Sequence, residues 1–283
     1  MRLWVHRYTL MPKRRLSGVA REGAREGALL RADDGFADLH PWPELGDAPL
    51  DQQLALLARG ETTPLTRASL HLAGLDGDAR RRGVSLFEGL TIPSSHWPGN
   101  DPHPAFDTIK IKGVMDVPDH VRVRIDFNAT LTPQEFLRIA ETLPKERIDF
   151  IEDPCPYDET VWQELEMRSG LTLAYDHPPA ANANRQPATR VLIHKPAIHE
   201  HWPVHQNIVV TSYMDHAIGQ FGAAYIAATH ETNARCGLFT HVLYEPDAFL
   251  ERISADGARL LPPNGTGIGF DDLLEQLSWT SIG

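Results

Sequence analysis

The sequence contains little cysteine, no long apolar run and no block of one charge. Cys155 and Cys236 are the only cysteines among 283 residues, too few for a disulfide framework, and isolated cysteines are usually small core residues. No stretch reaches the roughly 18 uninterrupted apolar residues of a membrane-spanning helix. Charged residues interrupt the N-terminal segment too early for the apolar core of a signal peptide. We therefore expect a soluble, cytoplasmic protein with no membrane partner.

The chain is acidic, with 27 Lys and Arg against 38 Asp and Glu and a formal net charge of −11. Neither sign is concentrated in a long block, so no basic face is offered to a phosphate backbone, and we expect no nucleic-acid partner. Hydrophobic residues make up 42% of the chain and charged residues 23%, which is typical of a globular protein. The 22 Pro and 21 Gly residues indicate many loops between short elements.

The first 85 residues predict a unit that mixes strands and helices. Strand character occurs at residues 4–10, 28–31 and 36–39, with a turn at 33–35. Asp51 is the expected N-cap of a short helix over 52–58, which Gly60 ends. Thr63 followed by Pro64 opens a longer helix towards Arg82, because Pro is favoured at the first helical position.

From about residue 86 short β-rich runs alternate with helices. The predicted strands are residues 87–92, 108–112, 121–126, 148–152, 171–176, 191–195, 208–213 and 237–240, and the predicted helices are 132–143, 158–169 and 217–229. Eight strands alternating with helices predict a (β/α)8-type barrel over residues 86–254, with a doubly wound open sheet as the alternative. The spacing is roughly 20 residues per strand–helix unit, against about 31 in the usual barrel, so we expect reduced helices.

The shortest connection lies between the second and third predicted strands. Only residues 113–125 separate Lys112 from Asp126, and the last five belong to the third strand. The others include Gly113 and Pro118, which disfavour a helix. We therefore predict an irregular loop with at most one helical turn between these strands.

Charged side chains stand at the C-terminal ends of five successive predicted strands, where the active sites of such barrels lie. In chain order these are Lys110 and Lys112, Asp126 with Asn128, Glu152, Asp176, and Lys195. Three carboxylates on successive strands converge on one point, as a hard, oxygen-liganded cation such as Mg²⁺ requires. Each residue alone is common in loops. The steps from Lys112 to the three carboxylates and Lys195 are 14, 26, 24 and 19 residues, and this regular register favours a single site.

The order K-x-K, D-x-N, E-D-P, D and K-P on predicted strands two to six resembles the enolase superfamily, muconate-lactonising subgroup, and most closely its o-succinylbenzoate synthases. Further matches are residues 25–27, 37–43, 124–128, 151–155, 211–219, 237–240 and 265–269. One departure is Asp215, where relatives often carry Glu. The resemblance implies that residues 1–85, with a return segment at about 255–283, form an α+β capping domain over the barrel of residues 86–254.

The resemblance also implies the chemistry. A Mg²⁺ ion, with Mn²⁺ as an alternative, would be held by Asp126, Glu152 and Asp176 and would bind a small-molecule carboxylate substrate. Lys112 would remove the α-proton, and Lys195 would face the anionic intermediate from the other side. The expected supporting or substrate-binding residues are Lys110, Arg124, Asn128, Thr211, Ser212, Asp215, Gly237 and Leu238. The implied reaction is syn elimination of water from 2-succinyl-6-hydroxy-2,4-cyclohexadiene-1-carboxylate, a step of menaquinone synthesis.

Other activities share part of this pattern. N-acyl amino acid racemases and dipeptide epimerases of the superfamily use the same lysines and carboxylates, although no Asp-x-Asp occurs at residues 237–240, where a dipeptide epimerase would carry it. A zinc hydrolase is suggested by His194, His199, His201 and His205, but the H-E-x-x-H spacing is missing. A non-catalytic binding barrel would not need lysines and carboxylates in register. Substrate specificity is expected from loops at 13–21 and 36–43, and the sequence carries no indication of the number of subunits.

Overall fold

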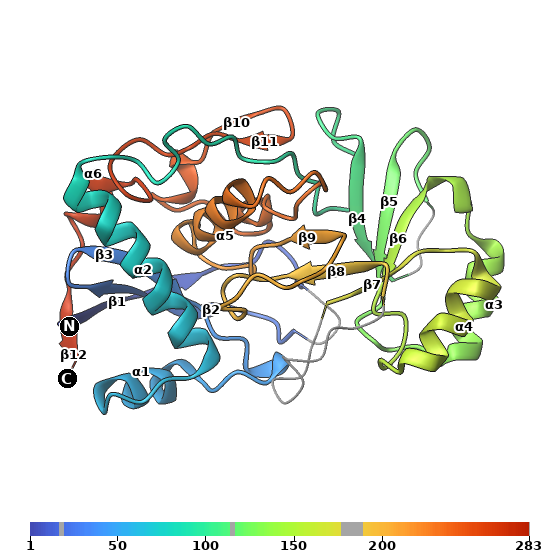
Figure 1. Ribbon diagram of the computed structural model, residues 1–283, viewed down its shortest axis with the longest axis horizontal. Coiled ribbons are helices and arrows are strands. Elements are labelled where there is room, and N and C mark those ends of the chain that lie inside the picture. The colour runs from blue at the N-terminus through green and yellow to red at the C-terminus, as the bar shows by residue number, and fades with distance from the viewer. Residues whose placement is uncertain (17–19, 114–116, 177–188, 283) are drawn as a thin grey trace.

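The computed structural model describes residues 1–16, 20–113, 117–176 and 189–282. Its N-terminal part is built on an antiparallel sheet in the order β12-β1-β2-β3 (Figure 1). The strands are β1 (Leu3–Leu10), β2 (Arg25–Ala32), β3 (Gly35–Leu39) and β12 (Thr280–Ile282). Because β12 pairs antiparallel with β1, the first and last described segments lie side by side.

Two helices pack on this sheet, α1 (Leu50–Ala58) and α2 (Pro64–Arg82). Thr63 caps α2 through a capping box, and Gly83 ends it in a left-handed conformation, as the Thr-Pro sequence predicts for its start. The expectation for α1 was wrong by a residue or two: Pro49 is the N-cap and Asp51 lies within the first turn. A carboxylate in the first turn stabilises a helix through the helix dipole without capping it.

The second part is a parallel sheet of six strands in sequence order, β4 to β9 (Figure 1). These are β4 (Thr108–Lys112), β5 (Arg122–Asp126), β6 (Ile148–Glu152), β7 (Leu173–Tyr175), β8 (Val191–His194) and β9 (Ile208–Val210). They correspond to six of the eight predicted barrel strands, in the predicted order. The register sets Lys112 beside Asp126 and Asp126 beside Glu152, so the charged strand ends lie level with one another.

Short extended segments close this sheet into a barrel. Trp97 forms a parallel bridge with Ile109 of β4, Ser95 bridges Cys236, and Gly237 bridges Thr211 at the end of β9. The prediction of a first strand at residues 87–92 was therefore wrong, since residues 94–97 take that place. Phe87 and Ile92 are buried, 4% and 1% exposed, but Phe87 belongs to a turn in which Gly89 has a positive φ of 72°, and Ile92 lies in the irregular segment after it. The eighth predicted strand is extended only at 236–237, and residues from Thr240 form a 3₁₀ turn.

Within the described residues, three α-helices follow barrel strands: α3 (Pro133–Thr142), α4 (Glu159–Ser169) and α5 (Ala217–Thr229). Thr132 and Asp158 cap the first two as predicted, and both helices cover the outside of the sheet at one end of the molecule (Figure 1). Between β4 and β5, residues 113 and 117–121 contain no helix, in agreement with the prediction for that part of the loop; residues 114–116 lie outside the described chain. The result is a (β/α)8-type barrel with reduced helices and an N-terminal α+β domain.

The remaining short elements connect or brace these parts. They are η1 (Pro43–Leu45), η2 (Lys145–Arg147), η4 (Thr240–Leu243), η5 (Leu250–Arg252), β10 (Ala255–Asp256), β11 (Arg259–Leu260) and α6 (Asp271–Leu274). Trp42 in the N-terminal domain donates a hydrogen bond from Nε1 to the carbonyl of Tyr213 in the barrel at 2.8 Å. Among the described residues, no helix combines the length and the apolar character needed to cross a membrane.

Candidate active site

A cavity of about 200 Å³ lies at the C-terminal ends of the barrel strands. The predicted site residues that line it are Lys110, Lys112, Asp126, Asn128, Asp176, Lys195, Thr211, Ser212 and Gly237. The N-terminal domain contributes Arg14, Arg15, Leu16 and Leu45 to its wall. The cavity therefore lies between the barrel and the domain expected to cap it, and charged groups from both domains face it.

Lys110 is the central cation of the site. Its Nζ atom lies 2.5 Å from Glu152 Oε1 and 3.1 Å from Asp126 Oδ2. Burial alone would lower the pKa of Lys110, but the charges of Asp126, Glu152 and Asp176 outweigh it and raise the pKa above its ordinary value. Lys110 is therefore suited to hold carboxylates as an ammonium rather than to act as a base.

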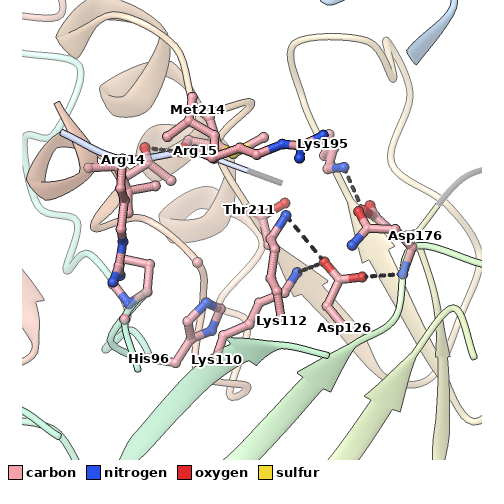
Figure 2. Close-up of a pocket in the computed structure, with 18 of the residues that line it drawn as sticks. Arg14, Arg15, His96, Lys110, Lys112, Asp126, Asp176, Lys195, Thr211 and Met214 are labelled. Atoms are coloured by element: carbon pink, nitrogen blue, oxygen red, sulfur yellow. Dashed lines mark hydrogen bonds and ion pairs between the residues drawn. The ribbon is translucent and has the colours of Figure 1, made fainter. Parts of the chain in front are cut away.

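Lys112 has the opposite electrostatic character, although it lies on the same strand and face. Its Nζ atom is 3.6 Å from Asp126 Oδ2, and its side chain is 34% exposed, pointing with Lys110 towards Asp126 (Figure 2). Burial lowers the pKa of Lys112, and the charges of Lys110 and Lys195 add to that effect, so the pKa lies below its ordinary value despite Asp126 and Glu152. An accessible amine with a lowered pKa suits a general base.

Lys195 lies directly after β8, four strands along the sheet from β4, which carries Lys110 and Lys112. Its Nζ atom is 2.6 Å from Asp176 Oδ2 (Figure 2) and 5.6 Å from the ring centre of Tyr213. The side chain is only 9% exposed. Lys112 and Lys195 thus reach one cavity from two non-adjacent strands, with the carboxylates between them.

The three carboxylates come from neighbouring strand ends. Burial, together with Asp126 and Asp176, raises the pKa of Glu152 well above its ordinary value despite the charge of Lys110. Burial would also raise the pKa of Asp126, but Lys110 and Lys112 lower it overall. The two lysines thus favour the ionised form of Asp126, whereas burial and the neighbouring carboxylates disfavour the ionised form of Glu152.

We tested whether this set fits a divalent cation. In the described part of the chain no three His, Cys, Asp or Glu side chains are gathered closely enough to hold a metal ion; the lysine ammonium groups lie against the carboxylate oxygens instead. The donors are all carboxylate oxygens, the type that Mg²⁺ prefers, and they stand at the ends of three successive strands, β5, β6 and β7. The residues therefore fit a hard divalent cation.

The remaining predicted residues divide into two groups. Asn128 adopts a positive φ of 49° directly after β5 and donates its backbone N–H to Asp126 Oδ1 at 2.9 Å, which fixes that carboxylate. Ser212 Oγ and Thr240 Oγ1 lie 2.6 Å apart on the wall formed after β9. Four predicted residues do not line the cavity: Glu152 is buried at the end of β6 with its carboxylate on Lys110, Leu238 is fully buried in the core, Arg124 lies beneath the site, and Asp215 points towards the N-terminal domain.

Asp215 lies near a second buried carboxylate, that of Asp38, and does not line the cavity. A Cβ atom placed on Gly219 would lie 2.5 Å from Asp215 Oδ2 and 2.7 Å from Asp38 Oδ2, so the two carboxylates are close neighbours. Burial and the charge of Asp38 raise the pKa of Asp215 well above its ordinary value. The chain turns at Met214, which has a positive φ of 52°, and this turn directs Asp215 away from the substrate space.

Sequence reasoning missed His96, Met214 and Thr240, which also line the cavity. His96 was missed because the first barrel strand was placed too early. The available signal was the His-Trp-Pro-Gly sequence at 96–99, a polar residue followed by a turn as at the other strand ends. Arg14 and Arg15 belong to the loop at 13–21 that was expected to set specificity; residues 17–19 of that loop lie outside the described chain.

The histidines that suggested zinc are arranged differently from a metal site. The rings of His194 and His199 stack with centres 5.3 Å apart, and Trp202 packs against His194 at 5.1 Å. Burial lowers the pKa of His194 to about 3. These side chains form an aromatic cluster behind β8.

The chain combines a parallel barrel with an α+β domain. The barrel carries Lys-x-Lys on one strand, a carboxylate on each of the next three and a lysine on the following strand. This combination identifies a member of the enolase superfamily, muconate-lactonising subgroup. Two solved structures share this fold. The dipeptide epimerase from Cytophaga hutchinsonii, complexed with Mg and the dipeptide D-Ala-L-Val, matches with a TM-score of 0.77 and 13% identity, covering 100% of this chain and 99% of that one. The mandelate racemase/muconate lactonizing protein from Herpetosiphon aurantiacus matches with a TM-score of 0.74 and 13% identity, covering 94% and 96%.

Sequence comparison resolves the family within the superfamily. Residues 3–79 match the family model for the N-terminal domain of o-succinylbenzoate synthase. The o-succinylbenzoate synthase of Bdellovibrio bacteriovorus is 32% identical over 320 aligned positions, which cover 97% of both chains. This chain belongs to the o-succinylbenzoate synthase family.

Proposed function

We propose that this protein converts 2-succinyl-6-hydroxy-2,4-cyclohexadiene-1-carboxylate to o-succinylbenzoate, with loss of water, as a step of menaquinone synthesis. The observation that carries the proposal is that Lys112, Lys195, Asp126 and Asp176 line one cavity, with Glu152 paired to Lys110 beside it, in a chain of this family. The reaction needs a base near a carboxylate-bearing carbon and positive charge for the anion that forms. Both requirements are supplied by side chains at the strand ends.

Proton transfer is assigned to Lys112. The neutral Nζ atom takes the proton from the ring carbon that bears the carboxylate, and the electron pair of that C–H bond passes into the carboxylate. As the pair returns to form the ring double bond, the C–O bond to the hydroxyl breaks. Nζ of Lys112 gives its proton to the departing hydroxyl on the same face, so water leaves and the lysine is neutral again.

The surrounding charges stabilise the intermediate. Lys195 places its ammonium on the β8 side of the cavity, where it faces the negative charge that develops on the substrate. Asp126, Glu152 and Asp176 would hold Mg²⁺ or Mn²⁺, which when bound supplies Lewis-acid stabilisation of the substrate carboxylate. Lys110 keeps Asp126 and Glu152 in place through its two ion pairs. Arg14 and Arg15 provide positive charge on the opposite, N-terminal-domain wall for the second carboxylate of the substrate.

A second candidate, N-acyl amino acid racemisation, is favoured by one observation: two lysines reach the same cavity from β4 and from the end of β8. A racemase needs one base on each face of the α-carbon, and this arrangement provides them. The dehydratase is preferred because the sequence similarity to an o-succinylbenzoate synthase extends over 97% of the chain.

The test is a pair of assays on purified enzyme with Mg²⁺: spectroscopic formation of o-succinylbenzoate, and racemisation of an N-succinyl amino acid. We expect dehydration to be the faster reaction and to stop in excess chelator. Asp126→Ala, Glu152→Ala and Asp176→Ala should each abolish it while circular dichroism shows a folded protein, because the three side chains act as one site. Racemisation without dehydration, or full activity in chelator, would contradict the proposal.

A further inference from the structure

His96 is fixed rigidly at the edge of the active-site cavity. Its backbone N–H donates to the carbonyl of Cys236 at 2.9 Å, and the flanking Trp97 N–H donates to the carbonyl of Thr108 at 2.9 Å. The side chain is 4% exposed, lines the cavity, and lies beside Lys110 on the side away from Asp126 and Asp176 (Figure 2). The segment at 94–97 thus presents one imidazole in a fixed position.

The tautomer of this imidazole is set by Arg124. The Arg124 Nη1 atom lies 2.9 Å from His96 Nδ1, and because a guanidinium can only donate, Nδ1 must accept. Arg124 is itself held by Asp149 Oδ2 at 2.8 Å and by the carbonyl of Arg235 at 2.7 Å. Burial and the charges of Arg124 and Lys110 lower the pKa of His96 well below its ordinary value. The ring is therefore neutral, with its proton on Nε2.

The Nε2–H group has no hydrogen-bond partner in the part of the chain that the structure describes. The Nε2 atom is also not completely enclosed by protein. Gly237 makes room for the ring on the neighbouring segment, because a Cβ atom at this position would lie 2.9 Å from His96 Cε1. A fixed, neutral donor that borders the cavity is suited to an uncharged acceptor oxygen of a ligand.

We propose that His96 binds the ketone oxygen of the succinyl side chain through Nε2–H. The inference rests on the proposed function and extends it to one contact. The ring carboxylate is assigned to the cation site, the departing hydroxyl to Lys112, and the terminal carboxylate to the arginines of the N-terminal domain. The ketone is the remaining substrate oxygen, and it can accept a hydrogen bond from a neutral donor. His96 then distinguishes a ketone-bearing side chain from an alkyl one.

The test compares two ligands that differ only in this oxygen. They are o-succinylbenzoate and 4-(2-carboxyphenyl)butanoate, in which a methylene replaces the ketone. Each is measured as a competitive inhibitor of the wild type and of the variants His96→Phe, His96→Gln and His103→Phe. Phe keeps the ring volume and removes the donor, whereas the amide nitrogen of Gln can reach the position of Nε2. His103 is the matched control, because it lies in the loop after the 94–97 segment and packs on Trp97 with ring centres 4.6 Å apart but does not line the cavity.

We expect the wild type to bind the ketone ligand about tenfold more tightly than the alkyl one, since one net hydrogen bond is worth up to about tenfold in affinity. His96→Phe should abolish this preference and lower kcat/KM by about the same factor. His96→Gln should retain most of it, and His103→Phe should retain all of it. If His96 only supported Arg124, Gln and Phe would lose activity equally and the ligand preference would not change.

The outcomes separate this inference from the proposed function. A wild type that dehydrates the substrate, but whose preference for the ketone ligand is the same in His96→Phe, would overturn the role of His96 alone. A wild type that neither forms nor binds o-succinylbenzoate would overturn the proposed function and the ketone contact with it.

Discussion

Removing the Lys110 ammonium should destabilise the protein strongly, because it lies between two carboxylates that have almost no access to water. The side chains of Glu152 and Asp126 are 1% and 5% exposed. Deleting one partner of a buried ion pair costs about 3–5 kcal/mol. For 283 residues the entropy of unfolding is roughly 0.6 kcal/mol per kelvin, so Lys110→Met should lower Tm by about 5–8 °C.

The loss should depend on pH with a definite sign. Glu152 already has a raised pKa, and Lys110 is the main group that lowers it, so in Lys110→Met the pKa of Glu152 rises further. A carboxyl group whose pKa is higher in the folded than in the unfolded state binds its proton more readily when folded, so its contribution to stability falls as pH rises. The difference in unfolding free energy between wild type and variant should therefore be larger at pH 8 than at pH 5.

Urea denaturation followed by circular dichroism, in chelator at both pH values, measures these quantities. Lys145→Met is the control, because Lys145 is exposed on η2 and its replacement should change stability by no more than about 0.5 kcal/mol. Added Mg²⁺ should restore more stability to Lys110→Met than to the wild type, since a ligand of the folded state stabilises it by mass action. Equal stability of wild type and Lys110→Met at pH 8 would refute this description of the site.

Two further predictions concern the N-terminal domain. Gly35→Ala should lower the unfolding free energy, measured by urea denaturation, by about 3 kcal/mol, the upper end of overpacking costs. The reason is that the new Cβ would lie 1.8 Å from the Ala73 carbonyl oxygen of α2. Gly74→Ala on α2, where nothing lies within 4 Å of the new Cβ, should leave the unfolding free energy unchanged or raise it. Burial opposes ionisation of Glu44, but hydrogen bonds from Arg21 and Arg25 lower its pKa to about 2. The gain in unfolding free energy of the wild type over Glu44→Gln should therefore be complete above about pH 5 and disappear as pH falls towards 2. A difference in unfolding free energy that stays constant over this range would contradict the assignment.

The barrel and most of its charged site could be predicted because local pattern and chemistry agree there. Lys110, Lys112, Asp126 and Asp176 stand where short β-branched runs end, and parallel register alone brings such ends together. The helix caps at Thr132 and Asp158 are equally local. Each of these features depends on residues only a few positions apart.

The features that were missed depend on partners far along the chain. The segment at 94–97 is polar, and its extended form is imposed by hydrogen bonds to Cys236, Thr108 and Ala258, whereas the more apolar residues 87–92 form a turn and an irregular segment. Asp215 is directed away from the cavity by the turn at Met214 and lies beside Asp38 of the other domain. No pattern within either segment contains this information.

The most direct test of the account is the rate of o-succinylbenzoate formation by Lys112→Ala. General base catalysis contributes about 10²–10⁴-fold, so kcat should fall by at least about a hundredfold while KM changes little, because Lys112 acts on the transition state rather than on ground-state binding. Lys145→Ala provides the control for loss of a lysine outside the cavity and should retain wild-type kinetics. A Lys112→Ala enzyme whose kcat stays within about tenfold of wild type, a barrier change of only about 1.4 kcal/mol, would show that another group removes the proton and would contradict the mechanism.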